Sequence, residues 1–151
     1  MTAPRLPFFV YGTLMKGFRN YDKHVRGFSS LRFVHDRAYV KRAALYHFEY
    51  GYPGLYATAS DDCVYGELLT ADDPAEYDQL LKDLDALEEY FAPNDPTNEY
   101  DRVRVQVHTA DGGRIDAWVY YCKIPLENAK ERVVSGDWRA YMTPMQQTMF
   151  L

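Results

Sequence analysis

The chain has 151 residues, which is enough for one well-buried core and short for two, so we expect a single domain over residues 1–151. Its formal net charge of −5 argues against a nucleic-acid-binding surface and favours a small-molecule partner. No run approaches the roughly 18 apolar residues that a membrane span needs, and the N-terminal segment has no signal-peptide core, so we expect a soluble, cytoplasmic protein.

The first predicted element is a buried strand, Phe8-Phe9-Val10-Tyr11, which runs directly into Gly12 and Thr13. A glycine after an apolar run lets the chain turn tightly and lets a ligand approach the backbone. Successive N–H groups on such a turn could converge on an anion or an oxyanion. An ordinary turn at the end of a strand would give the same pattern. Arg19 and Asn20 could line a pocket or lie in a solvated loop.

A β-rich region follows, dense in Val, Tyr, Phe and Leu and interrupted by turn signals near residues 51–54 and 60–62. Tyr52, Pro53 and Gly54 could shape a pocket wall or form a tight bend. The pattern predicts four strands: Leu31–Val40, Ala43–Phe48, Leu55–Ala57 and Val64–Leu69.

The clearest predicted element is a helix from about residue 73 to about Leu87. Asp73-Pro74-Ala75-Glu76 supplies an N-cap aspartate, a proline at the first helical position and a glutamate at N3. Its apolar residues recur at helical spacing. Projected at about 100° per residue, Glu88 falls inside the apolar stripe of this helix.

Glu88 needs an explanation, because a carboxylate is almost never fully buried without a partner. The structural explanations are that the helix frays before this point, or that Arg102 or Arg104 pairs with Glu88. The functional explanation is a general base or acid, whose pKa burial and the helix dipole would raise toward neutrality.

The second half of the chain predicts a hairpin and a short helix. Two strands are expected to be joined by Asp111-Gly112-Gly113. A short helix near Val134–Tyr141 would be capped by Ser135 or Asp137, and residues 143–151 would form a peripheral tail. The two hairpin strands are Tyr100–Thr109 and Arg114–Tyr121.

The histidines and cysteines do not indicate a metal site. Cys63 and Cys122 lie far apart without a C-x-x-C partner, so we expect two reduced thiols. The four histidines show no ligand spacing, and a phosphate-binding loop would need a Gly-Lys-Ser/Thr ending that the segment after Gly12 lacks. The residues therefore indicate neither a metal site nor a nucleotide-binding loop.

In its order of short motifs the sequence resembles the γ-glutamylcyclotransferase-like family, which includes plant avirulence-induced proteins and γ-glutamylamine cyclotransferases. The resemblance spans about residues 8–141. The motifs are Tyr11-Gly12-Thr13-Leu14, Tyr52-Pro53-Gly54-Leu55, Leu84-Asp85-Ala86-Leu87-Glu88, Tyr100-Asp101-Arg102 and Ala117-Trp118-Val119-Tyr120-Tyr121.

The resemblance implies an α+β fold around a small, mixed, partly open β-barrel, with one main helix carrying the catalytic glutamate and a pocket at one mouth. It implies that Glu88 is that glutamate. The implied substrate-binding residues are Tyr11, Gly12, Thr13 and Leu14, whose amides would hold the γ-glutamyl group, and the pocket tyrosines Tyr100 and Tyr121. The sequence departs from the family pattern at Glu89, where a glycine is common, and in a longer loop at residues 92–98.

The implied activity is intramolecular aminolysis of a small γ-glutamyl amine, amino acid or peptide, which releases 5-oxoproline and a free amine. Glu88 would act as general base and acid, without a metal or cofactor. The alternatives are a non-catalytic relative that binds a small ligand or a protein, and an unrelated acidic interaction module. The residues name neither the leaving amine nor the oligomeric state.

Overall fold

The computed structural model describes residues 5–48 and 52–142. All the predicted strands are present, with ends that differ from the prediction by up to three residues. In chain order the elements are β1 (Phe8–Val10), η1 (Tyr21–Val25), β2 (Leu31–Lys41), β3 (Ala43–Phe48), β4 (Tyr52–Ala57), β5 (Cys63–Ala71), α1 (Pro74–Leu87), β6 (Tyr100–Thr109), β7 (Arg114–Cys122), η2 (Leu126–Asn128) and β8 (Ala129–Val133).

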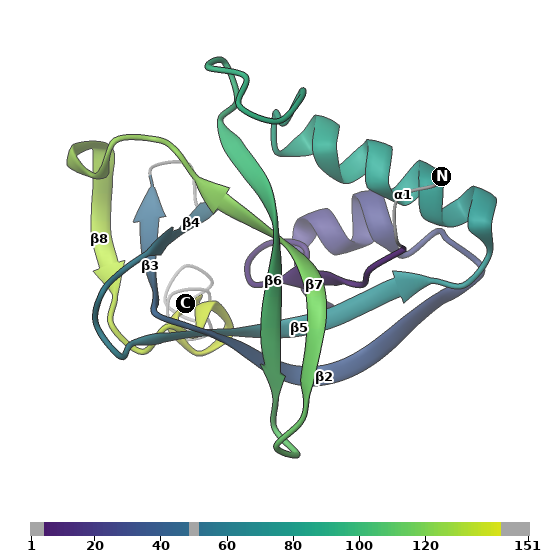
Figure 1. Cartoon of the computed structure of the whole chain (residues 1–151), viewed down its shortest axis with the longest axis horizontal. Helices are drawn as coiled ribbons and strands as arrows, with labels where there is room; N and C mark the ends of the chain where they lie inside the picture. Colours follow the sequence, from purple (N-terminus) through teal and green to yellow (C-terminus); the bar gives the residue numbers. More distant parts are fainter. Residues whose placement is uncertain (1–4, 49–51, 143–151) are drawn as a thin grey trace, which may run out of the picture.

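Five strands form a barrel in the order β1-β5-β2-β6-β7 (Figure 1). Every pairing is antiparallel except the contact of β1 with β7, which is parallel and consists of the single pair Phe8↔Trp118. The predicted α+β fold around a small mixed barrel is confirmed. The barrel is closed and not partly open, because this one residue pair joins its two edge strands.

A second sheet, in the order β4-β3-β8, lies beside the barrel (Figure 1). Tyr52, Pro53 and Gly54 belong to β4, so they do not form the tight bend that was one of their two predicted roles. Pro53 is tolerated there because β4 is an edge strand, where a missing backbone N–H breaks no ladder on the open side. This sheet places Pro53 against the loop that follows β1.

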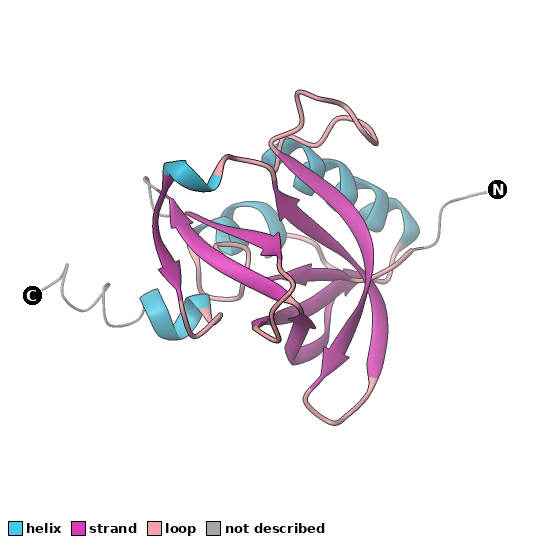
Figure 2. Ribbon diagram, turned by 60° about the vertical axis from the view of Figure 1, so that its left-hand side comes forward, coloured by secondary structure: helices cyan, strands magenta, loops and turns pink. Residues whose placement is uncertain are grey.

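The helix α1 packs beside β5 and η1 on the outside of the barrel (Figure 2). Asp73 caps it by accepting a hydrogen bond from the Glu76 N–H at 3.0 Å. Tyr77, Leu80 and Leu84 are buried, and each such side chain contributes roughly 1.5–3 kcal/mol. The Tyr77 hydroxyl also donates to the Leu6 carbonyl at 2.6 Å. These contacts fix the helix so that its C-terminus lies at one mouth of the barrel.

The predicted short helix near the C-terminus is present over residues 138–142. Asp137 caps it, accepting a hydrogen bond from the Ala140 N–H at 3.2 Å, and Trp138 is fully buried. The expectation of a peripheral tail at residues 143–151 falls outside the described residues. None of the described helices is long and apolar enough to cross a membrane.

Candidate active site

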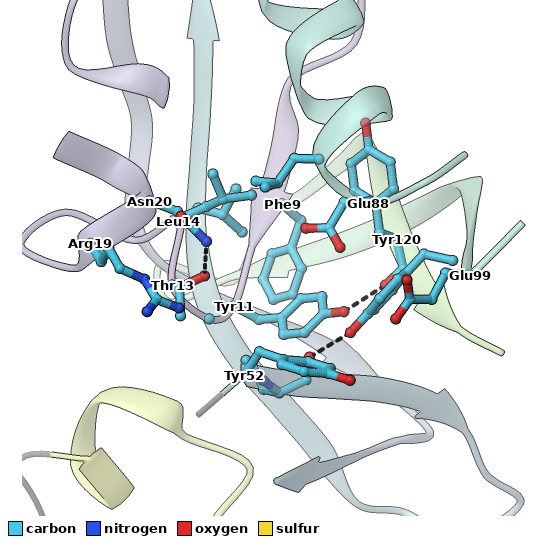
Figure 3. Close-up of a pocket in the computed structure, with 15 residues that line it drawn as sticks. Phe9, Tyr11, Thr13, Leu14, Arg19, Asn20, Tyr52, Glu88, Glu99 and Tyr120 are labelled. Carbon is cyan, nitrogen blue, oxygen red and sulfur yellow. Dashed lines mark hydrogen bonds between the residues drawn. The ribbon is translucent and has the colours of Figure 1, made fainter. Parts of the chain in front are cut away.

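A pocket of about 230 Å³ opens where the loop after β1, the start of β4, the end of α1 and the β6–β7 pair meet. This volume suits a small ligand and not a macromolecule. Figure 3 shows the pocket with its labelled side chains. It is lined by Phe9, Val10, Tyr11, Gly12, Thr13, Leu14, Arg19, Asn20, Tyr52, Pro53, Leu87, Glu88, Glu99, Tyr100 and Tyr120.

The loop after β1 forms one wall of the pocket, as the sequence predicts. Gly12 is required by close packing, because a Cβ at this position would lie 2.4 Å from the Pro53 Cγ atom. The Thr13 carbonyl accepts hydrogen bonds from the N–H groups of Asn20 at 3.0 Å and Tyr21 at 3.1 Å, and the Asn20 amide also donates to the Thr13 hydroxyl at 2.7 Å. These bonds hold the loop in a fixed shape.

The loop leaves a set of backbone donors for a ligand. The N–H groups of Gly12, Thr13 and Leu14 donate no hydrogen bond to any other residue that the structure describes. Buried or half-buried N–H groups normally have a partner, so donors at a pocket wall are suited to an anionic oxygen.

Of the two predicted pocket tyrosines, the structure places Tyr100 at the pocket and Tyr121 away from it. Tyr11 and Tyr100 line the pocket, but their hydroxyls donate to backbone carbonyls, those of Tyr120 at 2.8 Å and Pro53 at 2.9 Å. Burial is the main cause that raises the pKa of both phenols, so both are neutral. Tyr121 does not line the pocket. The next residue back on β7, Tyr120, does, because successive side chains of a strand point to opposite faces.

Tyr120 connects the pocket to a half-buried ion pair. Its hydroxyl donates to Asp85 Oδ1 at 2.6 Å, and the same oxygen lies 3.1 Å from Arg102 Nε. The Arg102 guanidinium also lies over the Trp118 ring, 4.4 Å from its centroid. Arg102 therefore interacts with Asp85 and Trp118 and does not pair with Glu88, so that explanation for the position of Glu88 is wrong.

The second arginine that was considered as a partner, Arg104, pairs instead with Asp116 at 2.9 Å. The helix also does not fray before Glu88, whose own N–H donates to the Leu84 carbonyl at 3.0 Å. Both structural explanations for an inward-facing Glu88 are thus excluded.

The end of α1 positions Glu88 through a Schellman motif. Glu88 is the C-cap residue, and Glu89 follows in the left-handed conformation with φ of 53°. The Glu89 N–H donates to the Ala86 carbonyl at 3.2 Å and the Tyr90 N–H to the Asp85 carbonyl at 2.9 Å, the two bonds that define this motif. The motif fixes the backbone from which the Glu88 side chain enters the pocket.

The Glu88 carboxyl is half-buried at the pocket wall, and it forms no ion pair or hydrogen bond with the other described residues. Burial, with a smaller contribution from the negative charge of Glu99, raises its pKa to about 8. A carboxyl that titrates near neutrality can both accept and donate a proton at physiological pH, and such groups cluster at functional sites. Figure 3 shows Glu88 entering the pocket from the end of the helix, across from the loop after β1.

Glu99 is the main site residue that the sequence did not indicate. It lines the pocket just before β6, and a hydrogen bond shared with Glu89, together with burial, raises its pKa to about 7. The sequence gives no signal for it, because Glu99 follows a run of other polar residues at the end of a loop. Within residues 5–48 and 52–142, no group of three or more His, Cys, Asp or Glu side chains could hold a metal ion.

Comparison with known proteins places this geometry in a family. Residues 8–140 match the family model described as gamma-glutamyl cyclotransferase, AIG2-like. The chain belongs to this enzyme family. A gamma-L-glutamyl-butirosin B gamma-glutamyl cyclotransferase from Niallia circulans is 34% identical to this family member over 135 residues, which cover 88% of this chain and 75% of the relative.

Solved structures of other proteins share the fold of this cyclotransferase-family chain. An AIG2-like protein from Mus musculus is 26% identical with a TM-score of 0.60, and the match covers 80% of this chain and 78% of that one. An uncharacterized protein from Pyrococcus horikoshii has a TM-score of 0.64 at 19% identity, over 94% of this chain and 97% of that one. The second likeness supports the fold alone.

Proposed function

We propose that this chain is a γ-glutamyl cyclotransferase that cyclises a small γ-glutamyl compound to 5-oxoproline and a free amine, with Glu88 carrying protons. One observation carries the proposal. An unpaired carboxyl with a pKa near 8 lines the same small pocket as three unused backbone N–H groups. The Niallia circulans relative, which is named as a γ-glutamyl cyclotransferase, supports the reaction class.

The substrate is held by its charged and polar groups. The N–H groups of Gly12, Thr13 and Leu14 bind the γ-carbonyl oxygen, and Arg19, at the same wall, binds the α-carboxylate. The α-ammonium lies next to Glu88, where its positive charge favours the ionised carboxylate. The neutral rings of Tyr11 and Tyr100 provide a rigid floor that limits water.

The reaction joins two groups of one molecule. Glu88 takes a proton from the α-ammonium, and the freed electron pair attacks the γ-carbonyl carbon to close a five-membered ring. The negative charge that develops on the carbonyl oxygen is stabilised by preorganised loop N–H groups. Because both reacting groups belong to one substrate, much of the entropic cost of bringing them together is avoided.

Collapse of the tetrahedral intermediate breaks the bond to the leaving nitrogen. Glu88 delivers its proton to that nitrogen and accepts the second proton from the ring nitrogen, which then passes to the departing amine. Two protons leave the α-nitrogen and two reach the leaving group, so the reaction needs no net exchange with solvent. A carboxyl with a pKa of about 8 is suited to both transfers near neutral pH.

The test is release of 5-oxoproline, measured by mass spectrometry, from a panel of γ-glutamyl amines, amino acids and peptides. We expect turnover by the wild type and a loss of at least 100-fold in Glu88→Gln, which is the usual contribution of a general acid–base group. Glu127→Gln is the matched control, because Glu127 is exposed and lies in η2, away from the pocket.

The thermal midpoint of each variant shows whether the fold is retained. A Glu88→Gln protein that stays folded and turns over at the wild-type rate would rule out the assigned role. Binding of a panel member without release of 5-oxoproline by the wild type would instead support the non-catalytic alternative.

A further inference from the structure

Charges of opposite sign lie at the two ends of the pocket. In Figure 3, Arg19 lies at the end formed by the loop after β1, and Glu99 lies at the opposite end. Glu88 lies between them at the wall contributed by α1. A ligand that spans the pocket therefore meets a positive charge and N–H donors at one end and a carboxyl at the other.

Glu99 is held in this position by its own backbone. Its N–H donates to the Glu89 carbonyl at 3.0 Å, and its carbonyl accepts from the Lys123 N–H at 3.0 Å. These two bonds join the end of α1 to the segment after β7 through Glu99. The carboxyl is therefore attached to a fixed point of the fold, although the residue belongs to a long loop.

Two basic side chains on segments next to Glu99, Lys123 and Arg102, form salt bridges with other residues and not with Glu99. Lys123 Nζ donates to the Asp95 carbonyl at 3.4 Å and lies 4.0 Å from Asp101, while Arg102 pairs with Asp85. Among the described residues, no lysine, arginine or histidine forms a salt bridge with Glu88, Glu89 or Glu99.

Glu89 reinforces the negative end of the pocket. It occupies the left-handed position after the C-cap, with φ of 53°, where glycine is favoured. Its carboxyl shares a hydrogen bond with that of Glu99. A non-glycine residue in this conformation carries a cost in backbone strain, and such residues cluster at functional sites.

We propose that Glu99, with Glu89 behind it, selects γ-glutamyl compounds whose leaving amine carries a second positive charge. This inference rests on the proposed function. With the α-carboxylate at the loop after β1 and the α-ammonium at Glu88, the leaving group extends toward Glu99. A second ammonium there gains an ion pair with the Glu99 carboxyl, whereas a carboxylate is repelled.

The test compares three amides whose leaving amines each have five carbons and differ in the group at the far end. They are the γ-glutamyl monoamides of 1,5-diaminopentane, pentylamine and 5-aminopentanoate. For the wild type we expect kcat/KM to be about 3- to 10-fold higher for the diamine than for pentylamine, as for a partly exposed ion pair, and lowest for the acid. The preference should weaken as salt is added.

Glu99→Gln should bring the ratio between the diamine and pentylamine close to one, while Glu127→Gln should keep the wild-type ratio. A merely structural role for Glu99 would lower all three rates together and leave the ratio unchanged, which would overturn the inference. Wild-type turnover of all three amides without a charge preference would also overturn it and would leave the proposed function standing. Absence of 5-oxoproline from every amide and from the wider panel would instead count against the proposed function.

Discussion

The contact between Gly12 and Pro53 gives the sharpest prediction about how the fold supports the site. In Gly12→Ala the new Cβ would lie 2.4 Å from Pro53 Cγ and 2.9 Å from Pro53 Cδ, well inside van der Waals contact. Pro53 is buried, and its carbonyl accepts a hydrogen bond from the Tyr100 hydroxyl, so neither the ring nor its backbone can move freely. The loop after β1 must therefore shift.

The size of the effect follows from overpacking. Adding a methyl group to a close-packed contact costs about 1–3 kcal/mol of unfolding free energy. For a chain of this length that is a fall of about 3–10 °C in the thermal midpoint. Because the same loop carries the N–H groups of Thr13 and Leu14, a shift of about 1 Å should also lower kcat/KM by about 100-fold.

The assay is thermal or urea unfolding together with 5-oxoproline release, with Gly27→Ala as the control. Gly27 is exposed, has a φ outside the left-handed region and would place its Cβ in open space, so its replacement should be neutral or slightly stabilising. Adding Pro53→Ala to Gly12→Ala should recover part of the lost stability, because the two substitutions act on one contact and their effects are not additive. If Gly12→Ala matches Gly27→Ala in both measurements, the packing argument is wrong.

Three further predictions concern Glu88, Asp85 and Gly136. Because burial raises the pKa of Glu88, the folded protein keeps a proton on this carboxyl that the unfolded chain loses between pH 4.5 and about 8. Over this pH range the unfolding free energy of the wild type should therefore fall by about 1–3 kcal/mol relative to that of Glu88→Gln. A pH-independent difference in urea unfolding would contradict this. Asp85→Ala should cost about 3–5 kcal/mol in the same assay, because it leaves the Arg102 charge half-buried and unpaired; a loss below about 1 kcal/mol would show that this pair is well solvated. Gly136→Ala should cost about 2–4 kcal/mol, because its φ is 69° and its Cβ would lie 2.0 Å from the Cys63 carbonyl oxygen, whereas Gly112→Ala, with φ of 91° in open space, should cost only about 1 kcal/mol. Equal thermal midpoints for these two alanine variants would show that the contact of Gly136 with Cys63 does not limit the side chain at position 136.

The sequence predicted the elements whose formation depends on residues close together in the chain, such as helix caps, apolar spacing and glycine turns. The helix α1 follows from the cap at Asp73 and the apolar spacing, and the β6–β7 hairpin from its glycine turn. The inward position of Glu88 follows from the same spacing, because the Schellman motif keeps the helix intact up to its cap. These features required no knowledge of the rest of the chain.

The features that were missed depend on contacts between distant segments. The strand β8 has only Val133 buried, so it lacks an alternating pattern and forms because it pairs with β3. The choice between Tyr120 and Tyr121 depends on which face of β7 points into the barrel mouth. Glu99 becomes a site residue only because its backbone bridges the end of α1 and the segment after β7. None of these relations is encoded in a short stretch of sequence.

Titration of Glu88 compared with the pH dependence of turnover tests the proton-carrying role most directly. Carbon-13 NMR of protein labelled at glutamate carboxyls, with the Glu88 signal assigned by its loss in Glu88→Gln, gives the pKa of this group. We expect a midpoint near pH 8, and we expect kcat/KM to rise with the same midpoint until the substrate ammonium itself loses its proton. A Glu88 carboxyl that titrates near 4.5, with kcat/KM following a different midpoint, would contradict the account.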